Sequence, residues 1–297
     1  MFIKTYKTTI KRILRSPLFW MALAVVAVLI FMRFQTGIYG SEKNDDFVLE
    51  YYKYYESIAN LLKSMMLYLI PCLCVVAVIT VIAGDYTDNF FEIEKSGGVS
   101  SITYFFGRLL GILTVLFTIT AIFSFVGYHY YFFTRGGTAN FTGFKQDAIE
   151  PWAIHSLKEY IFNSTDRLLR AILLCQFPVV ILFTTVTYTI GVLLESGILS
   201  GIGGSIGVVS AYLAAIRYQW AFDSIVYKYF LPANYGAYSY LLMYDTVFGS
   251  DKYTMPNGFN RFLNSTREEV IAWIAVMLGI SLLCIIVSYI MTHRRKI

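Results

Sequence analysis

The chain has 297 residues, of which 57% are hydrophobic and 14% are charged, and its mean hydropathy is +0.59. That composition excludes a soluble domain, a disordered chain and a disulfide scaffold, and it indicates an integral membrane protein. The excess of 24 Lys and Arg over 19 Asp and Glu gives a net charge of only +5, and it sits at predicted membrane boundaries, which argues against a nucleic-acid partner.

The N-terminal segment predicts a helix that lies on the cytoplasmic surface of the membrane. Between residues 2 and 16, apolar residues recur at helical spacing while Lys4, Lys7 and Lys11 occupy another face. Ser16 and Pro17 then turn the chain into the first span. Residues 1–17 are therefore assigned to an amphipathic interface helix, and the alternative is a charged tail that only sets the topology.

Six charge-poor stretches have roughly the 20 residues that a transmembrane helix needs. They lie near 18–32, 65–84, 109–133, 171–194, 198–216 and 270–291. Basic residues before the first stretch and after the last one predict that both termini are cytoplasmic, which requires an even number of spans. We therefore expect an all-α, polytopic protein of the plasma membrane, with residues 1–297 forming a single domain of six transmembrane helices.

Ionisable side chains are nearly missing from the predicted spans. Inside a bilayer such groups are costly, and they mark ion sites, proton relays or catalytic centres. His129, near the outer end of the third span, is typical of an interfacial histidine rather than a ligand. The pattern argues against an ion-coupled carrier and against a membrane metalloenzyme. We expect no catalytic residue, metal ligand or cofactor-binding residue in this chain.

The cytoplasmic loop at 85–104 is acidic, and it contains the candidate partner-coupling residues. These are four acids, a lysine and a glycine: Asp85, Asp88, Glu92, Glu94, Lys95 and Gly98. The first three are spaced i, i+3 and i+7, so a helix would place their carboxylates on one face. Gly97 and Gly98 would end that helix, and Ser100 or Ser101 would cap the next. Net negative charge on an inside loop indicates a protein partner rather than the lipid surface.

A glycine-rich stretch opens the fifth predicted span. Its candidate helix-packing residues are Gly197, Gly201, Gly203 and Gly207. The stretch has no Lys-Ser/Thr pair and lies in a span, so it is not a phosphate-binding loop. Small residues one turn apart favour close approach of two helices. The alternative is a flexible gate that lines a pathway.

With these features the chain resembles the ABC type-2 permease family, the membrane subunits of ATP-driven exporters. Members have a cytoplasmic elbow helix, an acidic coupling helix after the second span, and then a short pattern of Glu, Gly, Ser or Pro, Tyr, Gly and Lys or Arg. Those positions correspond here to Glu94, Gly98, Ser101, Tyr104, Gly107 and Arg108. The family also has an outer segment that partly re-enters the membrane, which residues 218–268 could supply.

The resemblance implies a permease that pairs with a second permease, identical or not, and that contacts two cytoplasmic ABC ATPase subunits. ATP and Mg would bind the ATPases, so this chain would not be an enzyme. The expected cargo is amphipathic or hydrophobic: an antimicrobial peptide, a drug or a lipid-like molecule. Aromatic residues at the ends of the spans predict contact with membrane lipid. The alternative is a non-transporting scaffold or sensor subunit whose loop binds another cytoplasmic protein.

Overall fold

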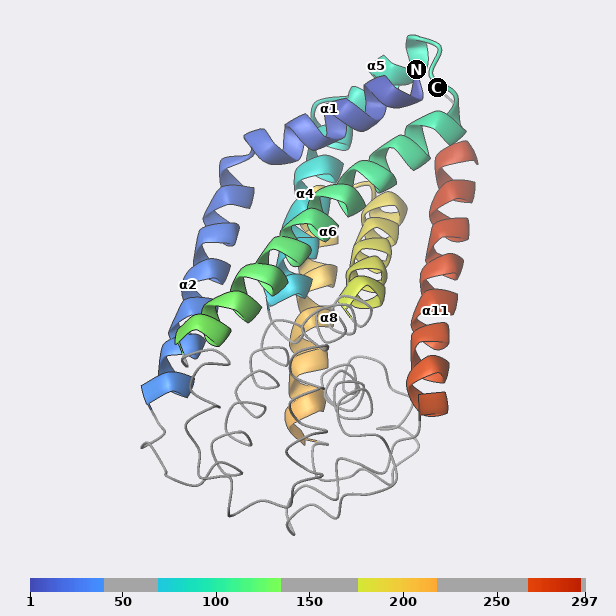
Figure 1. Ribbon diagram of the computed structural model, residues 1–297. Helices are drawn as coiled ribbons and strands as arrows, with labels where there is room; N and C mark the ends of the chain where they lie inside the picture. The colour runs from blue at the N-terminus through green and yellow to red at the C-terminus, as the bar shows by residue number, and fades with distance from the viewer. Residues whose placement is uncertain (40–68, 135–175, 218–266, 295–297) are drawn as a thin grey trace, which may run out of the picture.

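The computed structural model describes residues 1–39, 69–134, 176–217 and 267–294, and these segments contain eight helices and no strand (Figure 1). The predicted all-α class is confirmed for this part of the chain. Residues 65–68 and 171–175 of two predicted spans lie outside the described residues. The same holds for residues 218–266 of the predicted outer loop.

The helices cover the predicted apolar stretches wherever these are described. In chain order they are α1 (Phe2–Arg15), α2 (Pro17–Tyr39), α4 (Ile70–Thr87), α5 (Phe90–Ser96), α6 (Ser101–Thr134), the helix Gln176–Leu194, α8 (Gly197–Arg217) and α11 (Arg267–Arg294). Helices α2 and α6 run past the charges at which the predicted spans stop, Arg33 and Arg108. A single charge marks the edge of an apolar run, but a helix ends where its capping groups are.

Three helices in the described residues are long and apolar enough to cross a membrane: Ser101–Val126, Gln176–Leu194 and Ile274–Arg294. The number rises to at most five if α1 with Pro17–Leu29, and Ile70–Tyr86 with α5, each count as one bent span. The apolar part of α8 is shorter. These helices are compatible with a membrane-embedded protein, and the number of six spans stays a prediction.

The predicted bend at Ser16 and Pro17 is present, and it turns the chain by 62° between α1 and α2 (Figure 1). The Oγ of Ser16 accepts a hydrogen bond from the amide of Phe19 at 3.3 Å, which caps the start of α2. The indole nitrogen of Trp20 donates to the carbonyl of Leu14 at 2.7 Å across the bend. Local hydrogen bonds therefore fix the angle between the two helices.

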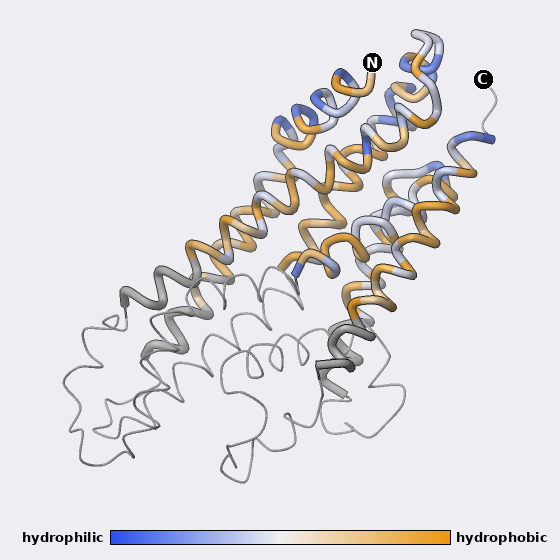
Figure 2. Tube along the Cα trace, turned by 45° about the vertical axis from the view of Figure 1, so that its right-hand side comes forward, coloured by the Kyte–Doolittle hydropathy of each residue, from blue (hydrophilic) through white to orange (hydrophobic). Residues whose placement is uncertain are grey.

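The face of α1 that packs on the rest of the protein is mostly polar. Thr5, Thr9 and Ile13 are buried, while Ile3 and Leu14 are 65% and 42% exposed. This face lies against α6 and α4. Figure 2 shows that hydrophilic residues gather at one end of the molecule. They lie on α1, on α5 and at the C-terminal end of α11.

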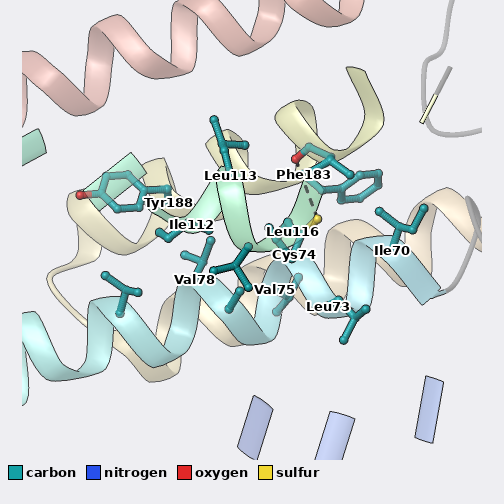
Figure 3. Close-up of a cluster of buried hydrophobic side chains, with 14 of the residues drawn as sticks. Ile70, Leu73, Cys74, Val75, Val78, Ile112, Leu113, Leu116, Phe183 and Tyr188 are labelled. Carbon is teal, nitrogen blue, oxygen red and sulfur yellow. Dashed lines mark hydrogen bonds between the residues drawn. The ribbon is translucent and has the colours of Figure 1, made fainter. Parts of the chain in front are cut away.

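The core is built around α4, which packs against α2, α6 and α8. Figure 3 shows side chains of α4 facing those of α6 and of the helix Gln176–Leu194. The residues drawn there include Leu73, Cys74 and Val78 of α4, all at most 2% exposed. In a bilayer such contacts act through close packing, because lipid tails are as apolar as leucine.

Two of the predicted packing glycines bring α8 against α4. A Cβ built at Gly197 would be 2.7 Å from the Cβ of Ala83, and one at Gly201 would be 2.6 Å from the Cδ1 of Ile79. At Gly197 the close atoms include the backbone of Ala83, whereas at Gly201 they belong to the flexible side chain of Ile79. Glycine at position 197 is therefore what allows the close approach of the two helices.

The other two predicted packing glycines differ. A Cβ at Gly203 would be 3.0 Å from Ile190 of the preceding helix, so this glycine contacts a different element from Gly197. A Cβ at Gly207 would have no described atom within 4 Å. The sequence pattern also left out Gly204, where a Cβ would be 2.8 Å from Val75 of α4.

Candidate partner-coupling site

The predicted coupling segment, residues 85–104, covers the end of α4, all of α5 and the start of α6, with a sharp turn between α4 and α5. Asn89, between α4 and α5, has a φ of 55° in the left-handed region, and the two helices meet at 62°. Asp85 lies on α4, Asp88 lies in the turn, and Glu92 lies on α5. The expectation that one helix places these three carboxylates on one face is wrong, because the chain bends between them.

Gly98 follows the end of α5, where the sequence predicts a helix break. Its φ of +80° is one that glycine adopts without strain, and its amide donates to the carbonyl of Lys95 at 3.0 Å. Two residues later, the Oγ of Ser100 accepts a hydrogen bond from the amide of Thr103 at 3.3 Å. Ser100, rather than Ser101, is therefore the cap of α6.

Two of the predicted coupling acids point into the protein and bind arginines. The Oδ1 of Asp85 is 2.8 Å from the Nη1 of Arg12 and 3.0 Å from the Nη2 of Arg108. The Oε1 of Glu94 is 3.3 Å from the same Nη2 of Arg108. These four side chains come from α1, α4, α5 and α6, and we call them the four-helix joint.

Two threonines of α1 extend the hydrogen bonding of the four-helix joint. Thr5 Oγ1 donates to the Oε2 of Glu94 at 3.3 Å, and the Nη1 of Arg108 donates to the Oγ1 of Thr9 at 3.1 Å. Both threonines are at most 2% exposed. The polar face of α1 is therefore buried because it has partners on α5 and α6.

Glycines on α6 allow α1 to come that close. A Cβ at Gly107 would be 3.0 Å from the Cγ2 of Thr5, and one at Gly111 would be 2.8 Å from the Cβ of Thr9. The two glycines are one helical turn apart, as are the two threonines, so they meet in register. The hydrogen bonds of the four-helix joint depend on this spacing.

Aromatic rings surround the two guanidinium groups. Arg12 lies 4.2 Å from the ring centre of Phe90, and Arg108 lies 5.1 Å from that of Tyr104. Phe91 of α5 is 8% exposed and packs edge-on against Tyr104 at 5.0 Å. A weakly hydrated guanidinium is suited to this environment, in which the ring faces attract the cation.

The four-helix joint balances its charges while excluding water. It holds two arginines and two carboxylates, and the side chains of Arg108 and Asp85 are 0% and 2% exposed. Taking such ions out of water is costly, and only close pairing offsets the cost. Asp85 and Arg108 each contact two other members, so removing either of them would leave an ion of the joint without its partner.

The other two coupling acids point away from the protein. Asp88 and Glu92 are exposed, and Ile93 beside them is 59% exposed. Lys95 is half-buried, with its Nζ 5.0 Å from the ring centre of Phe91. α5 is thus anchored through one side and presents Glu92 and Ile93 on the other, with Asp88 exposed in the turn before it.

The sequence-predicted site therefore divides into an inner pair and an outer pair of acids. Sequence reasoning placed Arg12 among the charges that set topology and missed its pairing with Asp85. A signal was present, because Thr5, Thr9 and Arg12 are spaced i, i+4 and i+7 on the side of α1 away from the lysines. Helical spacing identifies such a face but does not name its partners.

Among the described residues, no three His, Cys, Asp or Glu side chains gather in a way that could hold a metal ion. No protein-family model matches the sequence, and no curated protein matches it either. The likeness to ABC type-2 permeases therefore rests on the sequence pattern, and the site must be interpreted from its own geometry.

Proposed function

We propose that this chain is the permease subunit of an ATP-driven exporter of the plasma membrane. The observation that carries the proposal is α5, a short helix fixed on one side by buried contacts and exposed on the other. Glu92 and Ile93 lie on that exposed side, and Asp88 is exposed in the turn just before it. We call these three residues the docking face, and we assign it to a cytoplasmic ABC ATPase subunit that supplies the sites for ATP and Mg.

The composition of the docking face suits a protein partner. An exposed isoleucine can fill a pocket on the partner, and two flanking carboxylates can pair with basic residues at the rim of that pocket. The anchored side supports this assignment, because a docking element must keep its position when force is applied to it. The contacts of Phe91 and Glu94 hold α5 to α6.

The proposed topology has six spans, with both termini and α5 on the cytoplasmic side and α1 as the interface helix. Supporting this arrangement, the start of α1, the end of α11 and α5 lie at one end of the molecule (Figure 1). Lys4, Lys7 and Lys11 are exposed at that end, as expected for cytoplasmic residues. A second permease, identical or not, completes the proposed pathway for an amphipathic or hydrophobic cargo.

The test is co-purification of the chain with its ATPase in mild detergent. Reversing the docking face with Asp88→Lys and Glu92→Lys should weaken assembly by about 2–5 kcal/mol, roughly 30-fold or more, because it places like charges at a desolvated interface. The matched control is Asp45→Lys with Asp46→Lys on the predicted outer loop, which should leave assembly unchanged. If Asp88→Lys with Glu92→Lys assembles with the ATPase as well as the control variant does, docking through α5 is excluded.

A further inference from the structure

Glu94 joins α5 to two different helices at once. Its Oε1 is 3.3 Å from Arg108 of α6, and its Oε2 accepts a hydrogen bond from Thr5 of α1 at 3.3 Å. Thr5 and Glu94 are 89 positions apart in the sequence. One carboxylate therefore links the helix that carries the docking face to the helix at the N-terminus.

The backbone leaves the helical conformation on both sides of α5. Asn89 stands before α5 with a φ of 55°, and Gly98 stands after it with a φ of +80°. Both positions interrupt the helices, so no continuous helix holds α5 to α4 or to α6. Contacts with other helices hold it instead: those of Glu94 and Phe91, and that of the Phe90 ring with Arg12.

The second helix in this linkage, α1, has its own exposed surface. Ile3 and Leu14 are 65% and 42% exposed, and Lys4, Lys7 and Lys11 are exposed beside them. An apolar strip flanked by lysines is typical of a helix at a membrane surface. A movement of α1 would therefore change how the protein contacts the bilayer.

We infer that Glu94 is a positioning residue that makes α5 and α1 move together, so that a partner docked on α5 also displaces α1. The docked partner that would displace α1 is the one assigned under the proposed function, so this part of the inference rests on that proposal. The linkage itself is a property of this chain alone. It predicts that a change at one of the two helices loosens the other, although they are far apart in the sequence.

Hydrogen exchange of the full chain in lipid nanodiscs tests the linkage without any partner. Thr5→Val keeps the methyl group beside Gly107 and removes only the bond to Glu94. Exchange of the α5 amides should rise about threefold to tenfold, the range for one net hydrogen bond of ordinary strength. The matched control is Thr8→Val, because Thr8 Oγ1 donates to the carbonyl of Lys4 in its own helix.

Glu94→Ala provides the reciprocal test, with Glu92→Ala as its control, because alanine removes both the bond to Thr5 and the contact with Arg108. Exchange of the α1 amides should rise by a similar factor in Glu94→Ala and should not change in Glu92→Ala. Effects confined to the substituted helix, in either Thr5→Val or Glu94→Ala, would overturn the linkage.

The same measurement with the ATPase separates this inference from the proposed function. Partner binding should alter exchange in both α5 and α1 of the wild type, and the change in α1 should be smaller when Thr5 is valine. A partner that alters neither helix counts against docking through α5, while the linkage is still judged by the isolated chain. A partner that alters α1 equally in Thr5→Val contradicts the linkage.

Discussion

The two ends of α4 are held by different kinds of interaction. Around Leu73 and Val78 the helix lies in a core of apolar side chains and close-packed glycines of α8. Near its C-terminal end, Asp85 belongs to the four-helix joint, with two arginines and a second carboxylate. Less than four helical turns separate Leu73 from Asp85, at about 3.6 residues a turn.

This difference shows how one helix can combine a core that tolerates substitutions with a charged cluster that requires particular partners. Packing in the core is spread over many contacts, each worth a small energy, so no single apolar side chain determines the arrangement. In the four-helix joint the energy is concentrated in a few ions, each of which has one acceptable set of partners. We therefore expect substitutions in the joint to have larger effects than substitutions in the core.

The largest effect is expected for Arg108→Leu. Loss of this buried guanidinium removes the ion pairs of Arg108 with Asp85 and with Glu94. Breaking a buried pair in this way costs about 3–5 kcal/mol. The measurement is the free energy of unfolding of the purified chain in detergent. Arg15→Leu is the control, because Arg15 is exposed on α1 and should change stability by less than about 0.5 kcal/mol. If both variants lose the same free energy of unfolding, the expectation that the four-helix joint contributes more than an exposed charge is contradicted.

An intermediate effect is expected for Gly197→Ala in the core. The added methyl group would be 2.7 Å from the Cβ of Ala83, so α8 and α4 must separate, at a cost of about 1–3 kcal/mol. Gly207→Ala should be neutral or stabilising, because nothing described lies within 4 Å of its Cβ and alanine favours a helix. Thermal unfolding of both variants gives the comparison. A larger loss for Gly207→Ala would show that the packing face of α8 is assigned incorrectly.

The smallest effect is expected for a buried hydroxyl pair. Thr189 Oγ1 lies 2.8 Å from the Oγ of Ser288, which connects the helix Gln176–Leu194 to α11. Hydrogen bonds of this kind between membrane helices average about 0.6 kcal/mol, so Thr189→Val should cost about that much. Thr118→Val is the control, because Thr118 is exposed and its hydroxyl donates to its own helix at Thr114. A loss of stability above about 2 kcal/mol would show that this hydroxyl pair contributes as much as the ion pairs of the four-helix joint.

Local signals in the sequence were enough to predict most helix boundaries. Ser16 and Pro17 mark the bend after α1, and Gly98 marks the end of α5. These signals are reliable because a cap or a break depends on residues within one turn of it. The same local reasoning failed at Asn89, where a left-handed residue divides a segment whose composition favours a continuous helix.

The candidate site was only half predictable. Its acids are visible in the sequence as an acidic loop, but their division into an inner and an outer pair is not. Asp85 is buried because Arg12, 73 positions away, and Arg108 meet it, and no periodicity within the loop contains that information. The same applies to Gly204, which became a packing residue through a contact with Val75.

By itself, the sequence determined that the described chain is helical and apolar, and it located the bend at Ser16 and Pro17 and the break at Gly98, because those features follow from neighbours along the chain. Only the tertiary structure decided which charges lie inside and which remain available to a partner. A buried ion is tolerated only where partners from other helices surround it. For Asp85 and Glu94 those partners come from α1 and α6, whereas Asp88 in the turn before α5 and Glu92 on α5 face solvent.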